Sequence, residues 1–258
     1  MLKIDILTLF PEMFAPLETS IVKRAQDKQI VEIQITNIRD YALDKHQIAD
    51  DRPYGGGAGM VMKPEPLLAA IAARRQVEKP RILITSPAGR VYDQAYAREL
   101  SHEAQIMVVC GHYEGIDQRV IDCCNCELIS LGDFVLTGGE TAAIAIADSV
   151  TRLLPGALGD DASAEEESFT GALLEYPQYT RPAEYQGLSV PAVLQNGNHQ
   201  LIALWRRQQS LLRTYHYRPE LLAQAALTLE DVAFLNRVKQ EENKPFRLYT
   251  ALVHYPVY

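Results

Sequence analysis

A glycine-bracketed loop at residues 131–140 is the feature that most constrains what this chain can fold into. The loop reads Leu-Gly-Asp-Phe-Val-Leu-Thr-Gly-Gly-Glu and joins an apolar run to an alanine- and isoleucine-rich segment. Two similar junctions precede it, where apolar runs meet 86–89 (Ser-Pro-Ala-Gly) and 111–115 (Gly-His-Tyr-Glu-Gly). Each pattern is typical of a buried strand that ends in a tight turn. Ligands bind off the carboxyl ends of strands in an open α/β sheet, so we expect the three loops to form one pocket.

Strand-like and helix-like patterns alternate through residues 1–158, the predicted first domain. Such alternation predicts an α/β fold in which helices cover both faces of a mostly parallel sheet. The expected strands cover 3–9, 30–38, 81–85, 105–110 and 127–131, and the expected helices cover 12–27, 64–76, 93–101, 116–123 and 141–154.

The pattern changes after residue 158. A stretch rich in carboxylates and without basic residues follows, and we interpret 159–175 as a flexible acidic linker. Residues 176–245 are expected to form a small helical domain, with Asn198 as one helix cap and Thr228 with Asp231 as a capping box. Its expected helices cover 198–212, 219–226 and 228–242. The tail, 246–258, reads as a strand cut short, either the end of the chain or the start of a truncated further domain.

Composition favours a cytoplasmic protein that folds without disulfide bonds. A chain of 258 residues that is 47% hydrophobic can bury a sizeable core. Cys110 lies in an apolar run, and the other three cysteines crowd within 123–126, which fits neither a disulfide framework nor a spaced zinc site. The apolar N-terminal run contains Asp5 and meets Pro11, which excludes a signal peptide or a membrane span.

Charge is distributed unevenly along the chain. Residues 1–169 hold 16 basic and 26 acidic side chains, whereas 170–258 hold 9 and 7, so a polyanion should prefer the C-terminal part. In the helix expected at 198–212 and its next residue, an apolar stripe leaves Arg206, Arg207 and Arg213 on the exposed side. These arginines are candidate nucleic-acid contacts, and the alternative is an ordinary solvated face.

A second glycine-rich segment, 50–60, reads Asp-Asp-Arg-Pro-Tyr-Gly-Gly-Gly-Ala-Gly-Met. Its four glycines permit close approach of the backbone to a ligand. The segment lacks the Gly-Lys-Ser/Thr of a phosphate-binding loop and does not fit the dinucleotide fingerprint. A flexible surface loop is the alternative interpretation.

Four motifs together make the chain similar to the bacterial tRNA (guanine-N1-)-methyltransferases, the TrmD family of the SPOUT superfamily. They are the segments 52–60, 110–117, 132–140 and 176–182 (Tyr-Pro-Gln-Tyr-Thr-Arg-Pro), and the resemblance runs from about Leu2 to Glu242. It implies a trefoil knot in the C-terminal part of the sheet and a homodimer. It also implies S-adenosylmethionine as methyl donor, a magnesium ion, and the guanosine at position 37 of tRNA as acceptor. Neither DNA nor a membrane is expected as a partner.

The resemblance also implies the roles of individual residues. Asp51, Arg52 and Gly59 would lie against the target guanine, and Glu114 would accept hydrogen bonds or offset the charge of the donor. Plain turn chemistry remains the alternative for the glycines. The donor site carried over from the motifs comprises Ser86, Pro87, Gly89, Gly111, Glu114, Ser130, Leu131, Gly132, Asp133, Phe134, Val135, Leu136, Gly138 and Gly139.

Methyl transfer to guanine N1 requires loss of the N1 proton while negative charge spreads toward O6, so a base and a cationic or N–H donor are needed. The family's catalytic arginine matches Arg152. The alternative is that Arg152 has no catalytic role and only interacts with the negative C-terminal end of its helix. The family has an aspartate as base just before Ser168, and this chain has Glu167 there. Glu165 or Glu166 could substitute, and a solvated linker is the alternative.

Two rival functions predict different features. An α/β enzyme for a small nucleotide would involve no RNA, and a non-catalytic RNA-binding module would show a strongly basic face and no donor pocket. The acidic balance of residues 1–169 disfavours the RNA-binding module.

Overall fold

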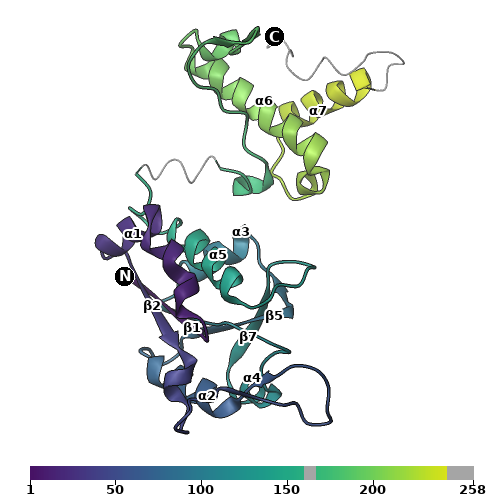
Figure 1. Ribbon diagram of the computed structural model, residues 1–258. Coiled ribbons are helices and arrows are strands. Elements are labelled where there is room, and N and C mark those ends of the chain that lie inside the picture. Colours follow the sequence, from purple (N-terminus) through teal and green to yellow (C-terminus); the bar gives the residue numbers. More distant parts are fainter. Residues whose placement is uncertain (160–166, 243–258) are drawn as a thin grey trace. The chain divides into compact units, whose positions relative to one another are not determined.

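The computed structural model describes residues 1–159 and 167–242. The chain divides into two compact units, Met1–Asp161 and Ala162–Tyr258, which are considered separately (Figure 1). The tail at 246–258, Glu165, Glu166 and part of the expected linker lie outside the described residues.

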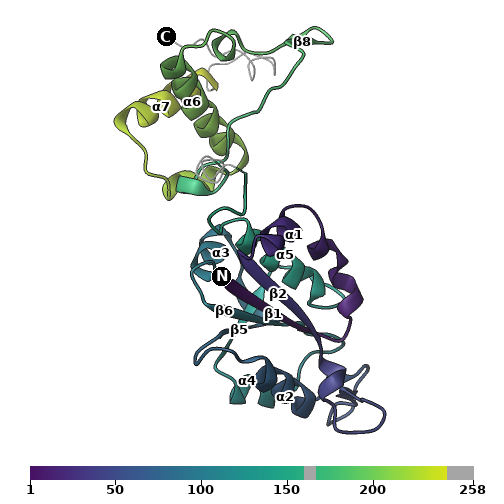
Figure 2. The same cartoon turned by 90° about the vertical axis from the view of Figure 1, so that its left-hand side faces the viewer.

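The N-terminal unit is built on a five-stranded, all-parallel sheet with strand order β2-β1-β6-β5-β7. The strands are β1 (Leu2–Thr8), β2 (Val31–Asn37), β5 (Arg81–Val91), β6 (Gln105–Val109) and β7 (Cys126–Ser130). One face is covered by α1 (Ser20–Asp27), α3 (Gln94–Leu100) and α5 (Glu140–Thr151), and the other by α2 (Pro64–Arg74) and α4 (Gln118–Cys123) (Figures 1 and 2). The predicted α/β class with helices on both faces is confirmed.

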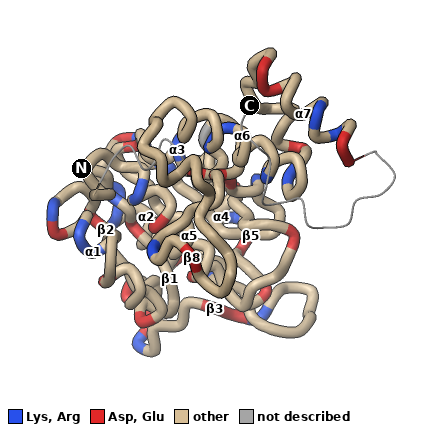
Figure 3. The backbone as a smooth tube through the Cα atoms, turned by 90° about the horizontal axis from the view of Figure 1, so that it is seen from above, with Lys and Arg blue, Asp and Glu red and all other residues tan. Residues whose placement is uncertain are grey.

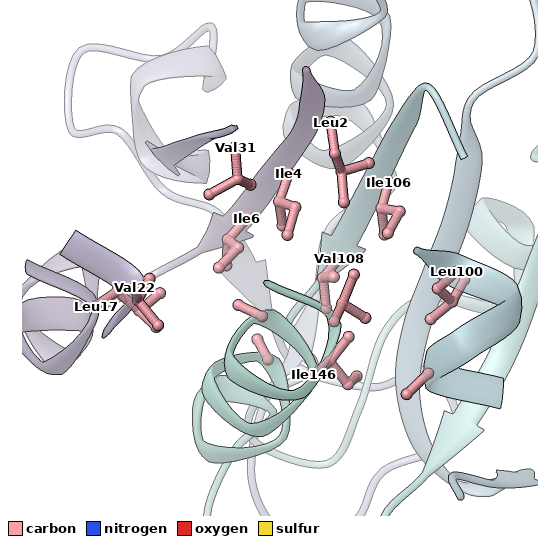
Figure 4. Close-up of a cluster of buried hydrophobic side chains, with 14 of the residues drawn as sticks. Leu2, Ile4, Ile6, Leu17, Val22, Val31, Leu100, Ile106, Val108 and Ile146 are labelled. Atoms are coloured by element: carbon pink, nitrogen blue, oxygen red, sulfur yellow. The ribbon is translucent and has the colours of Figure 1, made fainter. Parts of the chain in front are cut away.

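Alternation of side chains along β1 places apolar groups in two cores. Leu2, Ile4 and Ile6 point to the face that α1 and α5 cover (Figure 4), whereas Leu7 belongs to the core on the opposite face. Because successive side chains of a strand point to opposite faces, a central parallel strand must be apolar on both. All of β1 except Lys3 is buried.

Several element boundaries differ from the sequence pattern: the helix expected at 198–212 continues to Tyr217, for example, and the one expected at 219–226 is a 3-10 segment, Pro219–Ala223. Two differences in the N-terminal unit are the largest. The helix expected at 12–27 is a 3-10 segment, Pro11–Glu18, followed by α1, because Pro16 interrupts the first part and Ser20 has a φ of +53°. Strand β5 does not end at Thr85. Residues 86–89 bulge out of the ladder and pairing with β7 resumes at Arg90, so the expected turn is an enlarged β-bulge.

Shorter elements complete this unit. A two-stranded antiparallel ladder, β3 (Asp50–Asp51) with β4 (Val61–Met62), holds the two ends of the glycine-rich segment together, and a 3-10 turn covers Ile38–Tyr41.

A buried polar cluster is centred on Asp5, whose side chain is 2% exposed. Its carboxylate accepts hydrogen bonds from Arg74 Nε at 2.8 Å and from Gln105 Nε2 at 2.6 Å, and Arg74 Nη2 lies 2.7 Å from it. A carboxylate inside a core is tolerated only when it is paired and hydrogen-bonded. This cluster explains the acidic residue in an otherwise apolar strand.

The C-terminal unit packs α6 (His199–Tyr217) against α7 (Leu229–Glu242), with a 3-10 segment at Pro219–Ala223 between them. The core contains Leu173, Leu211, Leu212, Phe234, Leu235 and Val238. Both predicted caps are confirmed. Asn198 Oδ1 accepts from the backbone N–H groups of residues 200 and 201, and Thr228 and Asp231 exchange hydrogen bonds of 3.2 and 2.8 Å.

The arginines of α6 do not share one exposed face. Arg213 is exposed, but Arg206 and Arg207 are half-buried. Arg206 lies over the ring of Tyr176, 4.7 Å from its centroid, and Arg207 donates to Asp231 at 2.8 Å. The prediction of three exposed arginines was therefore wrong for two of them, because neighbouring segments bring an aromatic ring and a carboxylate to those positions. Figure 3 shows charges of both signs on α7.

The described end of the expected linker is folded. Phe169 N–H donates to Leu173 O at 2.7 Å around a 3-10 turn at Thr170–Ala172, and Leu174 N–H donates to Thr214 Oγ1 at 2.9 Å. Residues 167–175 thus differ from a flexible linker. Beyond them lie a hairpin, β8 (Glu184–Tyr185) with β9 (Leu188–Ser189), and a 3-10 turn at Ala192–Leu194.

Within residues 1–159 and 167–242, no helix has both the length and the apolar composition needed to cross a bilayer.

Removing the buried carboxylate of Asp5 should destabilise the N-terminal unit. Asp5→Ala leaves the Arg74 guanidinium without its counter-charge, and we expect a loss of about 3 kcal/mol in unfolding free energy. Urea titration measures the loss. Asp40→Ala removes an exposed carboxylate and should change stability by less than about 0.5 kcal/mol. A loss for Asp5→Ala as small as that of the control would contradict a structural role for the cluster.

Candidate active site

A cavity of about 530 Å³ lies at the carboxyl ends of β5, β6 and β7. Its walls come from the three loops that follow or interrupt these strands, so the structure brings the three junctions together as expected. Predicted donor-site residues that line it are Ser86, Pro87, Gly111, Glu114, Ser130, Leu131, Phe134, Val135, Leu136, Gly138 and Gly139. Gly89, Gly132 and Asp133 do not line it.

The three loops are held together by backbone contacts at Gly139. Its N–H donates to Gly111 O at 2.7 Å, and Gly111 N–H donates to Thr85 Oγ1 at 2.9 Å. A Cβ on Gly139 would lie 1.9 Å from Thr85 Oγ1 and 2.9 Å from Gly111 N. Since the φ of Gly139 is −81°, glycine is required here for space rather than for a left-handed conformation.

Gly89 lies outside the cavity lining and packs closely on a neighbouring strand. A Cβ there would lie 2.3 Å from Ile129 N, so the residue lets the bulge of β5 pack directly on the backbone of β7. Gly132, with a φ of +149°, turns the third loop away from β7 and carries Asp133 away from the cavity lining. Both glycines shape the loops without forming the wall.

The glycine-rich segment ends against the second loop. Glu114 N–H donates to Met60 O at 3.0 Å, and Met62 N–H donates to Gly115 O at 2.9 Å. A Cβ on Gly59 would lie 2.4 Å from Glu114 Oε1. Asp51, the last residue of β3, and Arg52, which follows it, are exposed at the start of the segment. The predicted target-guanine residues therefore belong to a loop tied to the cavity edge.

The cavity carries no positive side chain among its described lining residues, which include neither lysine nor arginine. Glu114 contributes a carboxylate at its edge, and the buried carboxylate of Glu140 lies behind Gly138. Phosphate groups are usually bound by lysine, arginine or free helix N-terminal N–H groups. At the N-terminus of α5 the Glu140 carboxylate already occupies the favourable position for an anion. The cavity is therefore suited to a neutral or cationic ligand.

Sequence reasoning missed three residues of this site. Thr85 accepts from Gly111, His112 lines the cavity, and Glu140 lies 3.6 Å from His112. His112 and Glu140 belong to the very motifs that indicated the site, and Thr85 ends the run before the first junction. Their positions in the sequence were the only available signal.

One predicted catalytic residue, Arg152, lies away from the cavity of its own chain, and the other, Glu167, belongs to the C-terminal unit. Arg152 is the C-cap of α5, whereas Gly138 and Gly139 precede the N-terminus of that helix. The 12 residues of α5 place these ends about 18 Å apart at 1.5 Å per residue. Glu167 is half-buried in a bend of the C-terminal unit.

Among the described residues, no group of three or more histidine, cysteine, aspartate or glutamate side chains is placed to hold a metal ion. The magnesium ion that the family resemblance implies therefore finds no fitting ligand set there. All four cysteines are free. Burial, and then the charge of Glu140, raises the pKa of the Cys110 thiol well above its usual value, which fits a packing role rather than a nucleophile.

The fold and the cavity define an α/β protein with a pocket at the carboxyl ends of parallel strands, the place where such sheets bind ligands. Residues 2–224 match the family model of the tRNA (guanine-1)-methyltransferase TrmD. The chain belongs to this family.

Curated relatives support the same assignment. The chain is 54% identical over 247 residues to a tRNA (guanine-N(1)-)-methyltransferase of Pelotomaculum thermopropionicum, covering 94% of this chain and 98% of the relative. An enzyme of the same name from Geotalea uraniireducens is 53% identical over 93% of this chain and 98% of its own length. A third enzyme of this name, from Carboxydothermus hydrogenoformans, is 55% identical over 91% of this chain and 92% of its own length.

Adding one methyl group at Gly139 should push apart the loops that form the cavity wall. Gly139→Ala forces Thr85 and the second loop to move, and we expect a loss of about 1 to 3 kcal/mol in unfolding free energy. We also expect at least about tenfold weaker binding of the cavity's ligand, because a loss of about 1.4 kcal/mol in binding free energy lowers the affinity tenfold. Gly159→Ala, where a Cβ meets nothing within 4 Å, is the matched control. Denaturant titration and calorimetry measure both effects, and equal behaviour of the two variants would contradict the packing account.

Proposed function

We propose that this chain transfers the methyl group of S-adenosylmethionine to N1 of the guanosine at position 37 of tRNA, in the cytoplasm. The observation that carries the proposal is the cavity without basic lining, formed by the three glycine loops of a chain in the TrmD family. Such a cavity suits a ligand whose reactive group is a sulfonium cation and which has no phosphate.

The residues present fit the donor. Glycines 111, 138 and 139 line the cavity without side chains that would occupy it, and Leu131, Phe134 and Leu136 provide an apolar wall against which an adenine can pack. Glu114 is placed to offset positive charge at the cavity edge. When bound, S-adenosylmethionine supplies an electrophilic methyl group.

The reaction needs two further groups. Glu167 is assigned to accept the N1 proton, and Arg152 is assigned to stabilise the negative charge that develops on O6. The methyl carbon–sulfur bond breaks as the nitrogen–carbon bond forms. The sulfur keeps the bonding electron pair, so the products are a neutral thioether and N1-methylguanosine.

The positions of these groups support a homodimer with composite active sites. Arg152 is separated from the cavity of its own chain by the length of α5, about 18 Å. The third loop exposes Phe134, Val135 and Leu136, with Val135 85% exposed, next to the cavity. A second copy that covers these apolar groups would supply its own Arg152 and Glu167 to the site.

We also propose the trefoil knot of the family for this unit. Its support is the tight interlock of the three loops, in which Gly89 packs on the backbone of β7 and Gly139 packs on Thr85 and Gly111. A knotted chain must pass one segment closely around another, and close backbone packing of this kind is what such a passage requires.

The C-terminal unit is proposed to bind tRNA. Arg213 lines a second cavity of about 330 Å³ with the aromatic side chains of Tyr179, Trp205 and Tyr217. A cation beside aromatic rings suits phosphate contact and base stacking. Arg206, which is stacked on Tyr176, is proposed to contribute less to tRNA binding than Arg213. Arg207 is proposed to stabilise the fold through its ion pair with Asp231.

The decisive experiment uses purified protein, methyl-labelled S-adenosylmethionine and a tRNA transcript. Label should appear as N1-methylguanosine at position 37, and a transcript with adenosine at that position should take up none. Turnover with free guanosine nucleotides and not with tRNA would favour the small-nucleotide enzyme. Tight tRNA binding without any methylation would favour the RNA-binding module.

Glu167→Gln tests the assignment of the base. The substitution keeps the shape of the side chain and removes proton acceptance, so single-turnover methylation should fall by about 10²- to 10⁴-fold. Glu167→Asp, which restores the family's residue, should retain most of the activity, and Glu166→Gln should have little effect. A Glu167→Gln rate close to that of wild type would place the base elsewhere.

Arg213→Ala tests the proposed tRNA contact. If Arg213 meets one phosphate, the slope of log affinity against log salt should fall by about 0.7 to 0.9. Filter binding over a range of salt concentrations measures the slope. Arg213→Lys keeps the charge and should keep the slope, and an unchanged slope for Arg213→Ala would exclude the contact.

A further inference from the structure

Glu140 is a buried carboxylate that the proposed reaction does not use. Its side chain is 1% exposed at the first position of α5. Thr8 Oγ1 donates to Glu140 Oε1 at 2.8 Å, whereas Glu140 Oε2 has no hydrogen-bond partner among the described residues. Burial of a carboxylate is costly, so a position that retains one requires a physical explanation.

The unpartnered oxygen faces the donor cavity through one layer of atoms. His112 Nδ1, which is also buried and unpartnered in the described structure, lies 3.6 Å from Glu140 Oε2. A Cβ on Gly138 would lie 2.3 Å from that oxygen and 2.4 Å from His112 Nδ1. Both His112 and Gly138 line the cavity. The Gly138 backbone and the His112 ring therefore separate the carboxylate from the ligand.

Three groups lie next to the Glu140 carboxylate. Thr8 donates a hydrogen bond to it, the N-terminus of α5 presents its positive end to it, and His112 Nδ1 lies 3.6 Å away. Phe10 and Tyr113 hold the ring of His112 on two sides, with centroids 4.6 and 4.7 Å away.

We propose that the buried charge of Glu140 selects the cationic methyl donor over its neutral product. This inference rests on the proposed function. S-Adenosylmethionine carries a positive sulfonium, and S-adenosylhomocysteine, which remains after transfer, carries a neutral sulfur. A negative charge behind the cavity wall attracts the sulfonium and leaves the neutral sulfur unaffected. Because Glu114 is exposed and screened by water, the buried carboxylate provides the larger part of this discrimination.

The test compares three ligands by calorimetry at pH 8, above the range in which histidine ordinarily titrates. S-Adenosylmethionine and sinefungin, which carries an amine in place of the methylsulfonium, are cations at the reactive position, and S-adenosylhomocysteine is not. Glu140→Gln keeps the shape and removes the charge. A unit charge about 10 Å away at an effective dielectric constant of about 20 is worth roughly tenfold in affinity.

We expect Glu140→Gln to bind both cations about tenfold more weakly and S-adenosylhomocysteine within about twofold of wild type. Retained binding of the neutral product also shows that the variant is folded. Glu140→Asp should restore the preference for the cations. Asp148→Asn removes the same charge from an exposed position of α5 and should leave all three affinities unchanged.

If Glu140→Gln fails to fold, the pair Thr8→Val with Glu140→Leu removes the charge together with its hydrogen-bond partner, and the same pattern is expected. Equal weakening of all three ligands would show a structural role and overturn the inference, as would no change in any of them. Wild-type protein that binds none of the three ligands would instead overturn the proposed function.

Discussion

The contact of Gly139 with Thr85 and Gly111 is the constraint on which the donor site depends. The distances that a Cβ would have, 1.9 Å to Thr85 Oγ1 and 2.9 Å to Gly111 N, leave no room for any side chain. This contact fixes where α5 begins, and it brings the loops after β6 and β7 against the end of the first part of β5. The same approach keeps side chains out of the cavity at these glycines, and apolar side chains such as Phe134 and Leu136 complete its wall. A wall of this kind can enclose an adenosine without placing basic groups next to a cation.

Helix α5 sets the second constraint. Its N-terminus closes the cavity and carries the buried Glu140, and its C-terminus carries Arg152. A rigid helix of 12 residues cannot bring both ends to one reacting centre. Under the proposed function, a second copy of the chain combines the donor with the arginine. The exposed apolar side chains of residues 134–136 are what such a copy would cover.

Particular residues show how much the sequence could predict. The five parallel strands followed from apolar runs, and the helix caps at Asn198 and Thr228 followed from local side-chain chemistry, since both are encoded by neighbouring residues. The bulge of β5 could not be predicted from the sequence, because a Ser-Pro-Ala-Gly segment is typical of a strand end. Only the pairing of β7 with the residues before and after this segment shows that the strand continues. Arg207 was predicted to be exposed because its partner, Asp231, lies on another helix.

The site was predictable to a similar extent. The three glycine loops indicated where the cavity lies, but Gly89 and Gly132 could not be separated from the glycines that line it, because all of them occur in the same motifs. The pairing of His112 with Glu140 depends on a contact between two loops that the sequence does not reveal.

Mixed dimers test the central claim, that methyl transfer occurs in a composite site of two chains. At a donor concentration that saturates only the wild-type cavity, a chain with Gly139→Ala should bind little donor, and a chain with Arg152→Ala lacks the group assigned to stabilise O6. Each homodimer should be nearly inactive. A purified heterodimer of the two combines one intact cavity with one intact arginine, and it should recover about half of the wild-type turnover, one of the two sites of a symmetric dimer. A heterodimer as inactive as both homodimers would contradict the account, because each reaction would then use the cavity and the arginine of one chain.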